Sequence, residues 1–318
     1  LAEWLDNAIK SFTALWPNLS FFNLDYNVLG LLALILVGLV CGSVSSLVLG
    51  NRLAFFSSAL THSAFAGVSL GFLLALASGV KTEADFYDWL TPVMVGFGIL
   101  VGLGIAWVRE RTSLTSDTVI GIFNAGALGS GAILLSIVSQ RKYFNAENIL
   151  FGNLLSLNSQ DIINLFFLVL ITGFVLYYLY NEMVFASFNP SLARSRGARV
   201  RLANYLFIAL LAAIMHFCLK SVGTLLIHAL LIVPAATAVN FCSNLRQFFW
   251  WTIILCVGVG LMSQFLSWQI FVLNPALGKE LGIGIGGIMV VLSVLLFFLS
   301  MPLSIWLRSR RARNAKVS

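Results

Sequence analysis

The chain has 318 residues, of which 59% are hydrophobic and only 10% are charged, with a net charge of +7 and a mean hydropathy of +0.96. A single core of this length cannot cover so much apolar surface, which excludes an ordinary water-soluble protein. The apolar runs are long and show no strand-like alternation, which excludes a transmembrane barrel and predicts an all-α, polytopic transmembrane helical bundle.

Residues 1–26 are expected to form a segment of their own. Trp4, Ile9, Phe12 and Trp16 recur at helical spacing among charged residues, which predicts a short amphipathic helix lying in the membrane interface. The segment lacks a basic start followed by an uninterrupted apolar core, so we do not expect it to be a signal peptide.

About nine segments, each of roughly 20 residues, are expected to cross the membrane as helices. They lie near residues 27–49, 53–79, 89–108, 117–139, 160–181, 203–219, 222–242, 246–270 and 283–306. Together they predict a transmembrane domain over residues 27–307, followed by a basic tail over residues 308–318. Several glycines stand at helix-packing spacing in these spans, among them Gly98 with Gly102, Gly126 with Gly129, and Gly258 with Gly260.

The basic residues predict how these helices are oriented. If the C-terminal tail is cytoplasmic, alternate loops place most of the 19 basic residues inside and the acidic loop over residues 83–88 outside. Nine spans then put the N-terminus outside the cell. The positive charge is explained by orientation and by contact with anionic membrane lipid, so it gives no reason to expect nucleic acid as a partner.

The four cysteines, Cys41, Cys218, Cys242 and Cys256, are scattered singly through apolar segments. Without a paired spacing they are expected to pack as small apolar residues, and no disulfide framework is implied. The minor alternative is that Cys41 faces a metal path.

Two histidines lie deep in predicted spans and are the candidate metal ligands. His62 is about ten residues, roughly 15 Å of helix, from Arg52, which places it near the midplane of a hydrocarbon core about 30 Å thick. His228 lies about seven residues, roughly 11 Å, into the seventh span. An ionisable group at such depth is a candidate functional residue, and Ser58, one turn before His62, and the adjacent Thr61 would share its path.

Neutral imidazoles suit zinc, whereas manganese would require oxygen donors as well. The alternative is that each histidine only hydrogen-bonds across a helix interface. That structural role is the expected one for His216, which lies nearer the outer boundary beside Lys220.

Pro234 lies in the seventh span, six residues after His228. Because proline has no N–H, it predicts either a break that lines a transport site or a simple kink. The loop over residues 182–202 is polar and basic, and its Asn189-Pro190 pair predicts the start of a short cytoplasmic helix that would suit the docking of a soluble partner.

Several stretches then carry a resemblance to a known family. They are Arg52 to Gly67 with Ala59-Leu60-Thr61-His62-Ser63, Asp117 to Gly121, Leu150 to Leu155, Phe188 to Gly197, and Gly223 to Ala238. In the same order, from about residue 30 to residue 300, they resemble the membrane permeases of ABC-type zinc, manganese and iron importers. The most specific piece is Pro234-Ala235-Ala236-Thr237-Ala238.

The resemblance implies a type II ABC importer permease-like fold in a bacterial cell (inner) membrane, with two copies of the chain around a two-fold axis. A separate cytoplasmic ATPase subunit would hydrolyse ATP, and an extracellular or periplasmic binding protein would deliver the ion. The segment with Asn189, Pro190, Ala193 and Gly197 is similar to the family's ATPase coupling loop. The chain would itself be a transport permease and not an enzyme, which agrees with the lack of a phosphate-binding loop motif in its sequence. No cofactor would be permanently bound, because the divalent metal ion is the cargo.

The chain also departs from this family's pattern. Ser58 stands where such permeases usually carry aspartate, and Asn189 also stands where aspartate is usual. Losing a carboxylate beside His62 weakens the case for manganese, and His228, where relatives often have a small residue, would add a nitrogen ligand and favour zinc or ferrous iron. Two alternatives stay open: a permease of the same architecture that carries a siderophore or cobalamin, and a secondary transporter, which would usually need a deep carboxylate that is not evident here.

Overall fold

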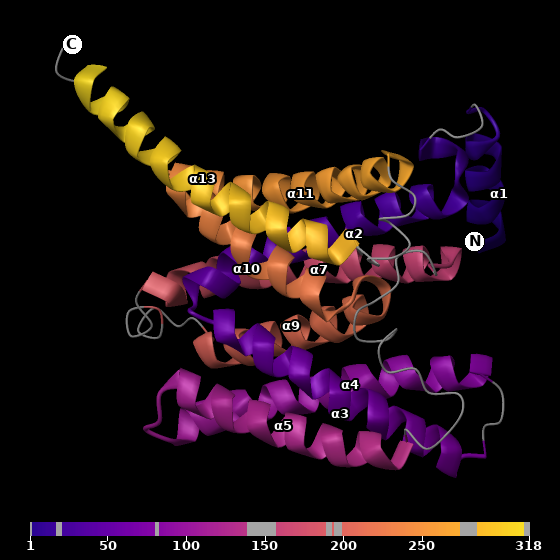
Figure 1. The fold of residues 1–318 in the computed structure, drawn as a ribbon. Coiled ribbons are helices and arrows are strands. Elements are labelled where there is room, and N and C mark those ends of the chain that lie inside the picture. Colours follow the sequence, from indigo (N-terminus) through magenta and orange to yellow (C-terminus); the bar gives the residue numbers. More distant parts are fainter. Residues whose placement is uncertain are drawn as a thin grey trace. The chain divides into compact units, whose positions relative to one another are not determined.

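A computed structural model describes residues 2–16, 21–79, 83–138, 157–188, 193, 199–273 and 285–314 (Figure 1). Every regular element in these ranges is helical, which confirms the all-α prediction. The elements are α1 (Ala2–Thr13), the 3-10 turn η1 (Phe21–Asn23), α2 (Asp25–Gly50), α3 (Ala54–Ala77), α4 (Glu83–Arg111), α5 (Ser116–Val138), α7 (Ser159–Phe188), α9 (Val200–Val222), α10 (Thr224–Phe241), α11 (Leu245–Leu273) and α13 (Ile285–Asn314).

Eight helices in the described ranges are long and apolar enough to cross a membrane, namely α2, α3, α4, α5, α7, α9, α11 and α13. The seventh predicted span coincides with α10, whose 18 residues include a shorter apolar stretch, Leu226–Phe241. Each of the nine predicted spans therefore corresponds to a helix. Some helices extend further than predicted: α7 continues to Phe188, although its span was expected to end near residue 181, because a helix does not have to stop where the hydrocarbon ends.

Contacts divide the chain into two compact units. The first consists of Leu1–Leu49, Leu154–Val169 and Leu225–Ser318, and the second of Gly50–Asn153 and Leu170–Thr224. The first unit therefore holds α1, α2, α10, α11 and α13, and the second holds α3, α4, α5 and α9. Helix α7 contributes to both.

In the first unit, α2 and α11 approach each other closely through two glycines one turn apart. A Cβ atom added at Gly42 would lie 2.7 Å from the Cα of Ile253, and one added at Gly38 would lie 3.1 Å from the Cα of Val257. Small residues allow such approach in lipid, where no hydrophobic force drives helices together. This pair was not among the predicted packing glycines, although its four-residue spacing was visible in the sequence.

The N-terminal helix α1 is tied to the first unit by two polar contacts. The hydroxyl of Ser159 donates a hydrogen bond to the carboxylate of Asp6, and the hydroxyl of Thr13 donates to Asp25 Oδ1 at 2.8 Å. Exposed apolar side chains, including Trp4, lie on the same segment. The structure thus has a helix over Ala2–Thr13 in this segment, and its place as an amphipathic helix in the membrane interface stays a prediction.

In the second unit, α3 packs against α4, α5 and α9, and α4 packs against α9 (Figure 1). The predicted packing role of the Gly98 and Gly102 pair is confirmed, because a Cβ at Gly98 would overlap the imidazole of His216 and one at Gly102 would lie 3.4 Å from Ala212 Cβ. By contrast, a Cβ added at Gly126, Gly129 or Gly258 would meet no atom within 4 Å. For those three glycines, contacts within the described chain do not supply the predicted packing role.

Candidate functional site

Helix α3 presents Ser58 and His62 on its least covered stripe. Both side chains are half-buried, and Phe55, one turn before Ser58, is 66% exposed. The intervening Ala59 and Leu60 are fully buried. Residues three and four apart lie on one helix face, so Phe55, Ser58 and His62 form one partly exposed patch, called here the open stripe. Further along the same face Ala66 and Ser69 are buried, and the Nδ1 atom of His62 is itself buried.

Thr61 lies on a different face of α3. Its side chain is buried in the second unit, and its hydroxyl donates a hydrogen bond to the Ser57 carbonyl at 2.9 Å. Since that donor is used within the helix, Thr61 does not join Ser58 and His62 on the open stripe.

His228 lies on α10, in the first unit, and is half-buried. Its neighbours Ile227 and Leu230 are fully buried, whereas Val239, further along α10, is 48% exposed. His62 belongs to the second unit, so each histidine is described within its own unit, and their pairing in one metal site stays a prediction.

Of the predicted coupling-loop residues, the structure describes only Ala193, which is fully buried. Asn189, Pro190 and Gly197 lie outside the described residues. In the parts of the chain that the structure describes, no three or more His, Cys, Asp or Glu side chains gather as a group that could hold a metal ion.

The prediction of a helix break at Pro234 is corrected by the structure. Helix α10 runs without interruption from Thr224 to Phe241, with Pro234 inside it. Proline lacks the N–H that would bind the carbonyl four residues earlier, which is that of Leu230. That carbonyl instead lies 3.4 Å from the Ser45 hydroxyl of α2 and 3.3 Å from the Cys256 thiol of α11. Neighbouring helices thus compensate for the missing donor, and the helix continues.

Cys256 is the principal donor to this freed carbonyl. A serine hydroxyl has one proton, and that of Ser45 lies much closer to the Cys41 carbonyl, at 2.5 Å, than to the Leu230 carbonyl. The thiol of Cys256 is therefore left to serve Leu230. Cys41, Cys218 and Cys256 are buried and Cys242 is half-buried, and none of these four forms a disulfide, which agrees with the predicted packing role. The donor role of Cys256 was not predicted.

We expect the cost of removing the Cys256 donor to depend on Pro234. Cys256→Ala should lower the free energy of unfolding by about 0.5–2 kcal/mol, because a buried carbonyl loses its partner, whereas Cys256→Ser should retain stability. In a Pro234→Ala background, a backbone N–H serves Leu230, and Cys256→Ala should then cost less. Thermal unfolding of the detergent-solubilised variants measures this difference. An equal cost in both backgrounds would contradict the assigned donor.

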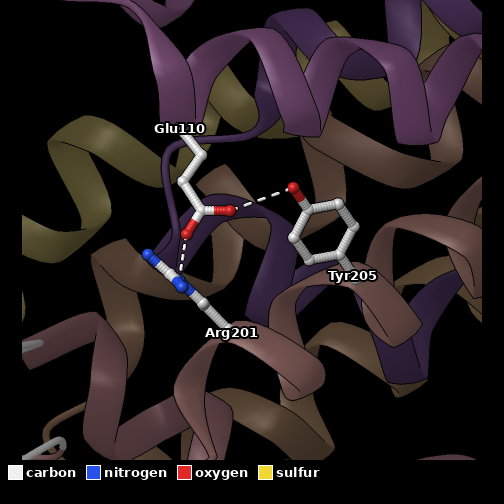
Figure 2. Close-up of polar contacts among 3 residues, drawn as sticks. All are labelled: Glu110, Arg201 and Tyr205. Atoms are coloured by element: carbon white, nitrogen blue, oxygen red, sulfur yellow. Dashed lines mark hydrogen bonds and ion pairs between the residues drawn. The ribbon is translucent and has the colours of Figure 1, made fainter.

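A polar cluster joins the end of α4 to the start of α9 in the second unit (Figure 2). Glu110 forms an ion pair with Arg201 Nε through one carboxylate oxygen and accepts a hydrogen bond from Tyr205 Oη at 3.0 Å through the other. The Arg201 side chain is 81% exposed, so the pair contributes at most about 1 kcal/mol. The ion pair lies at the start of α9, directly after the loop that was predicted to couple to the ATPase.

Comparison with known proteins shows which family and which proteins this chain resembles. The family model described as the ABC 3 transport family matches residues 23–304. The manganese import system permease protein ScaB of Streptococcus parasanguinis is 29% identical over 270 residues, which cover 85% of this chain and 88% of ScaB. The high-affinity zinc uptake system membrane protein ZnuB of Buchnera aphidicola is 28% identical over 249 residues, 78% of this chain and 89% of ZnuB.

A solved structure gives the same result for the fold. PsaBC from Streptococcus pneumoniae, in complex with Fab, superimposes with a TM-score of 0.67 at 26% sequence identity. The match covers 86% of this chain and 90% of the compared chain.

Proposed function

Because this chain belongs to the ABC 3 transport family, we propose that it is the transmembrane permease of an ATP-driven importer of a divalent metal ion: zinc, manganese or iron. The observation that carries this proposal is the alignment with permeases of both manganese and zinc import systems along 78–85% of the chain. The open stripe on α3 adds a local argument, since the imidazole of His62 and the hydroxyl of Ser58 are both only half-buried there.

The proposed path for the ion lies between two copies of the chain. Ser58 and His62 are half-buried on the open stripe of α3, and a second copy related by two-fold symmetry would bring an identical pair. The ion would rest there and leave inward by alternating access. His228 is proposed as an additional ligand from α10.

The energy would come from a cytoplasmic ATP-binding cassette subunit, which hydrolyses ATP while this chain provides the passage. Its contact is proposed at the segment with Asn189, Pro190, Ala193 and Gly197, between α7 and α9. An external metal-binding protein would deliver the ion. This arrangement requires a cytoplasmic C-terminus and an external N-terminus, as the distribution of basic residues favours. The exposed apolar side chains of α1 support its proposed place in the membrane interface.

The donor set favours zinc or ferrous iron over manganese. Each chain would contribute the neutral nitrogen of His62 and the uncharged oxygen of Ser58, and manganese prefers harder, carboxylate-rich sites. Serine at position 58 therefore predicts a preference for zinc and ferrous iron, which bind nitrogen ligands more readily than manganese does.

Reconstitution of the permease with its ATPase in proteoliposomes tests the proposal. With the binding protein and ATP present, we expect uptake of labelled zinc, ferrous iron or manganese, and no uptake with a catalytically inactive ATPase. Uptake of a ferric siderophore or cobalamin in place of the bare ions would favour the alternative cargo. Ion uptake that persists with the inactive ATPase would indicate a secondary transporter and would overturn the proposal.

A further inference from the structure

Three helices of the second unit meet at the side chain of His216. The residue lies on α9 and is fully buried. Its Nδ1 atom is 2.8 Å from the Ala212 carbonyl of the same helix, and its Nε2 atom is 3.2 Å from the Ser63 hydroxyl of α3. On α4, Gly98 lies against the ring so closely that an added Cβ would overlap it. These contacts confirm the expectation of a structural, hydrogen-bonded histidine, and they also have a consequence for α3.

The two hydrogen bonds specify where the protons lie. A carbonyl oxygen can only accept, so Nδ1 must carry a proton and donate it to Ala212. In the neutral ring Nε2 is then an acceptor, and the Ser63 hydroxyl, 3.2 Å away, is the group that faces it as a donor. The same hydroxyl lies 2.7 Å from the Leu60 carbonyl of its own helix. The one proton of the hydroxyl is therefore shared between the Leu60 carbonyl and Nε2, and its interaction with Nε2 connects α3 to α9.

The contact between Ser63 and His216 affects the orientation of His62, the residue before Ser63. His62 immediately precedes Ser63, and successive residues of an α-helix are about 100° apart around the axis, given about 3.6 residues per turn. A rotation of α3 that broke the contact between Ser63 and His216 would turn Ser58 and His62 by the same angle. The direction of the open stripe thus depends on the bond that Ser63 makes.

We propose that His216 is a positioning residue, which fixes the rotation of α3 through Ser63 and so aims the imidazole of His62 at the transported ion. The inference rests on the proposed function, because it takes His62 as an ion ligand. It explains why a polar ring is buried at this depth, where an apolar side chain would carry no cost of desolvation. It also explains why α4 has glycine at position 98, since no larger residue leaves room for the ring.

Cobalt(II) binding to the purified importer complex tests this assignment, because the visible spectrum of cobalt(II) reports the geometry of its ligands. Ser63→Ala removes the donor with the smallest change in volume, and His216→Leu removes the acceptor. We expect each to alter the spectrum and to weaken cobalt(II) binding roughly 10-fold, as the loss of an outer partner of a metal ligand does. The double variant should be no worse than either single one.

Ser69→Ala is the matched control. Ser69 is also buried on α3, and its hydroxyl has no hydrogen-bond partner in the described structure, so this variant should bind cobalt(II) as the unmodified complex does. If Ser63→Ala and His216→Leu lower only the melting temperature and leave cobalt(II) binding and its spectrum unchanged, His216 is purely structural and the inference is overturned. If His216→Leu fails to fold, Ser63→Ala alone decides. A His62→Ala arm separates the premises: when it also leaves cobalt(II) binding unchanged, the proposed ion site itself is refuted.

Discussion

Replacing His62 with alanine is expected to abolish metal uptake by the reconstituted importer while the chain still folds. The imidazole is half-buried on the open stripe, so its removal creates a smaller cavity than the removal of a fully buried side chain would. Uptake should fall by at least 10- to 100-fold, the range found when even an outer partner of a metal ligand is lost. Initial rates of zinc and ferrous iron uptake measure the loss, and the melting temperature in detergent checks the fold.

Ser58, one turn before His62 on α3, provides the matched comparison for His62→Ala. Ser58→Asp retains the imidazole and adds a carboxylate one turn away, on the same stripe, so uptake should persist with its preference moved towards manganese. Uptake rates of the three ions in competition measure the shift. If His62→Ala transports normally, or if Ser58→Asp leaves the preference unchanged, the open stripe of α3 does not hold the ion.

The second large effect is expected at the contact between α2 and α11. Gly42→Ala should lower the free energy of unfolding by about 1–3 kcal/mol, the usual cost of overpacking, because the new methyl group would meet the backbone of Ile253 at 2.7 Å. Backbone cannot move aside as a flexible side chain can, so the two helices must separate. Thermal unfolding of the solubilised chain measures the change.

Gly258→Ala on α11 is the control for Gly42→Ala. A Cβ there meets no atom within 4 Å, and alanine is the better helix former by about 1 kcal/mol. This variant should be as stable as the unmodified chain or more so. A Gly42→Ala variant that unfolds at the unmodified temperature would show that α2 and α11 are further apart than described.

The helices could be predicted from the sequence because length and hydropathy alone specify them. Every predicted span corresponds to a helix, including the short α10. The ends of the helices were less predictable. Helix α7 continues seven residues past its expected end, to Phe188, because hydropathy indicates which residues lie in the hydrocarbon and not where the helix ends. The residues expected to couple to the ATPase lie mostly outside the described ranges, so that part of the site stays a prediction.

The sequence could not reveal which side chains from distant parts of the chain contact each other. The sequence left a break and a kink open at Pro234, and the absence of a break could not be predicted, because the donors that compensate for the proline lie on α2 and α11, away from α10 in the chain. Among the histidines, depth in the span identified His62 as a candidate ligand, and that role stays a prediction. Depth did not reveal that His216 bonds to Ser63, because that contact joins residues 153 positions apart.

The thiol that serves the Leu230 carbonyl has a practical consequence for spectroscopy on this protein. Attaching spin labels or fluorophores at chosen sites usually begins with a background from which native cysteines have been removed. Here alanine is a suitable replacement at the half-buried Cys242, but position 256 needs serine, which still donates a proton. A background with alanine at position 256 would have a loosened α10. Distances measured in it would then reflect the loss of the thiol as well as the transport cycle.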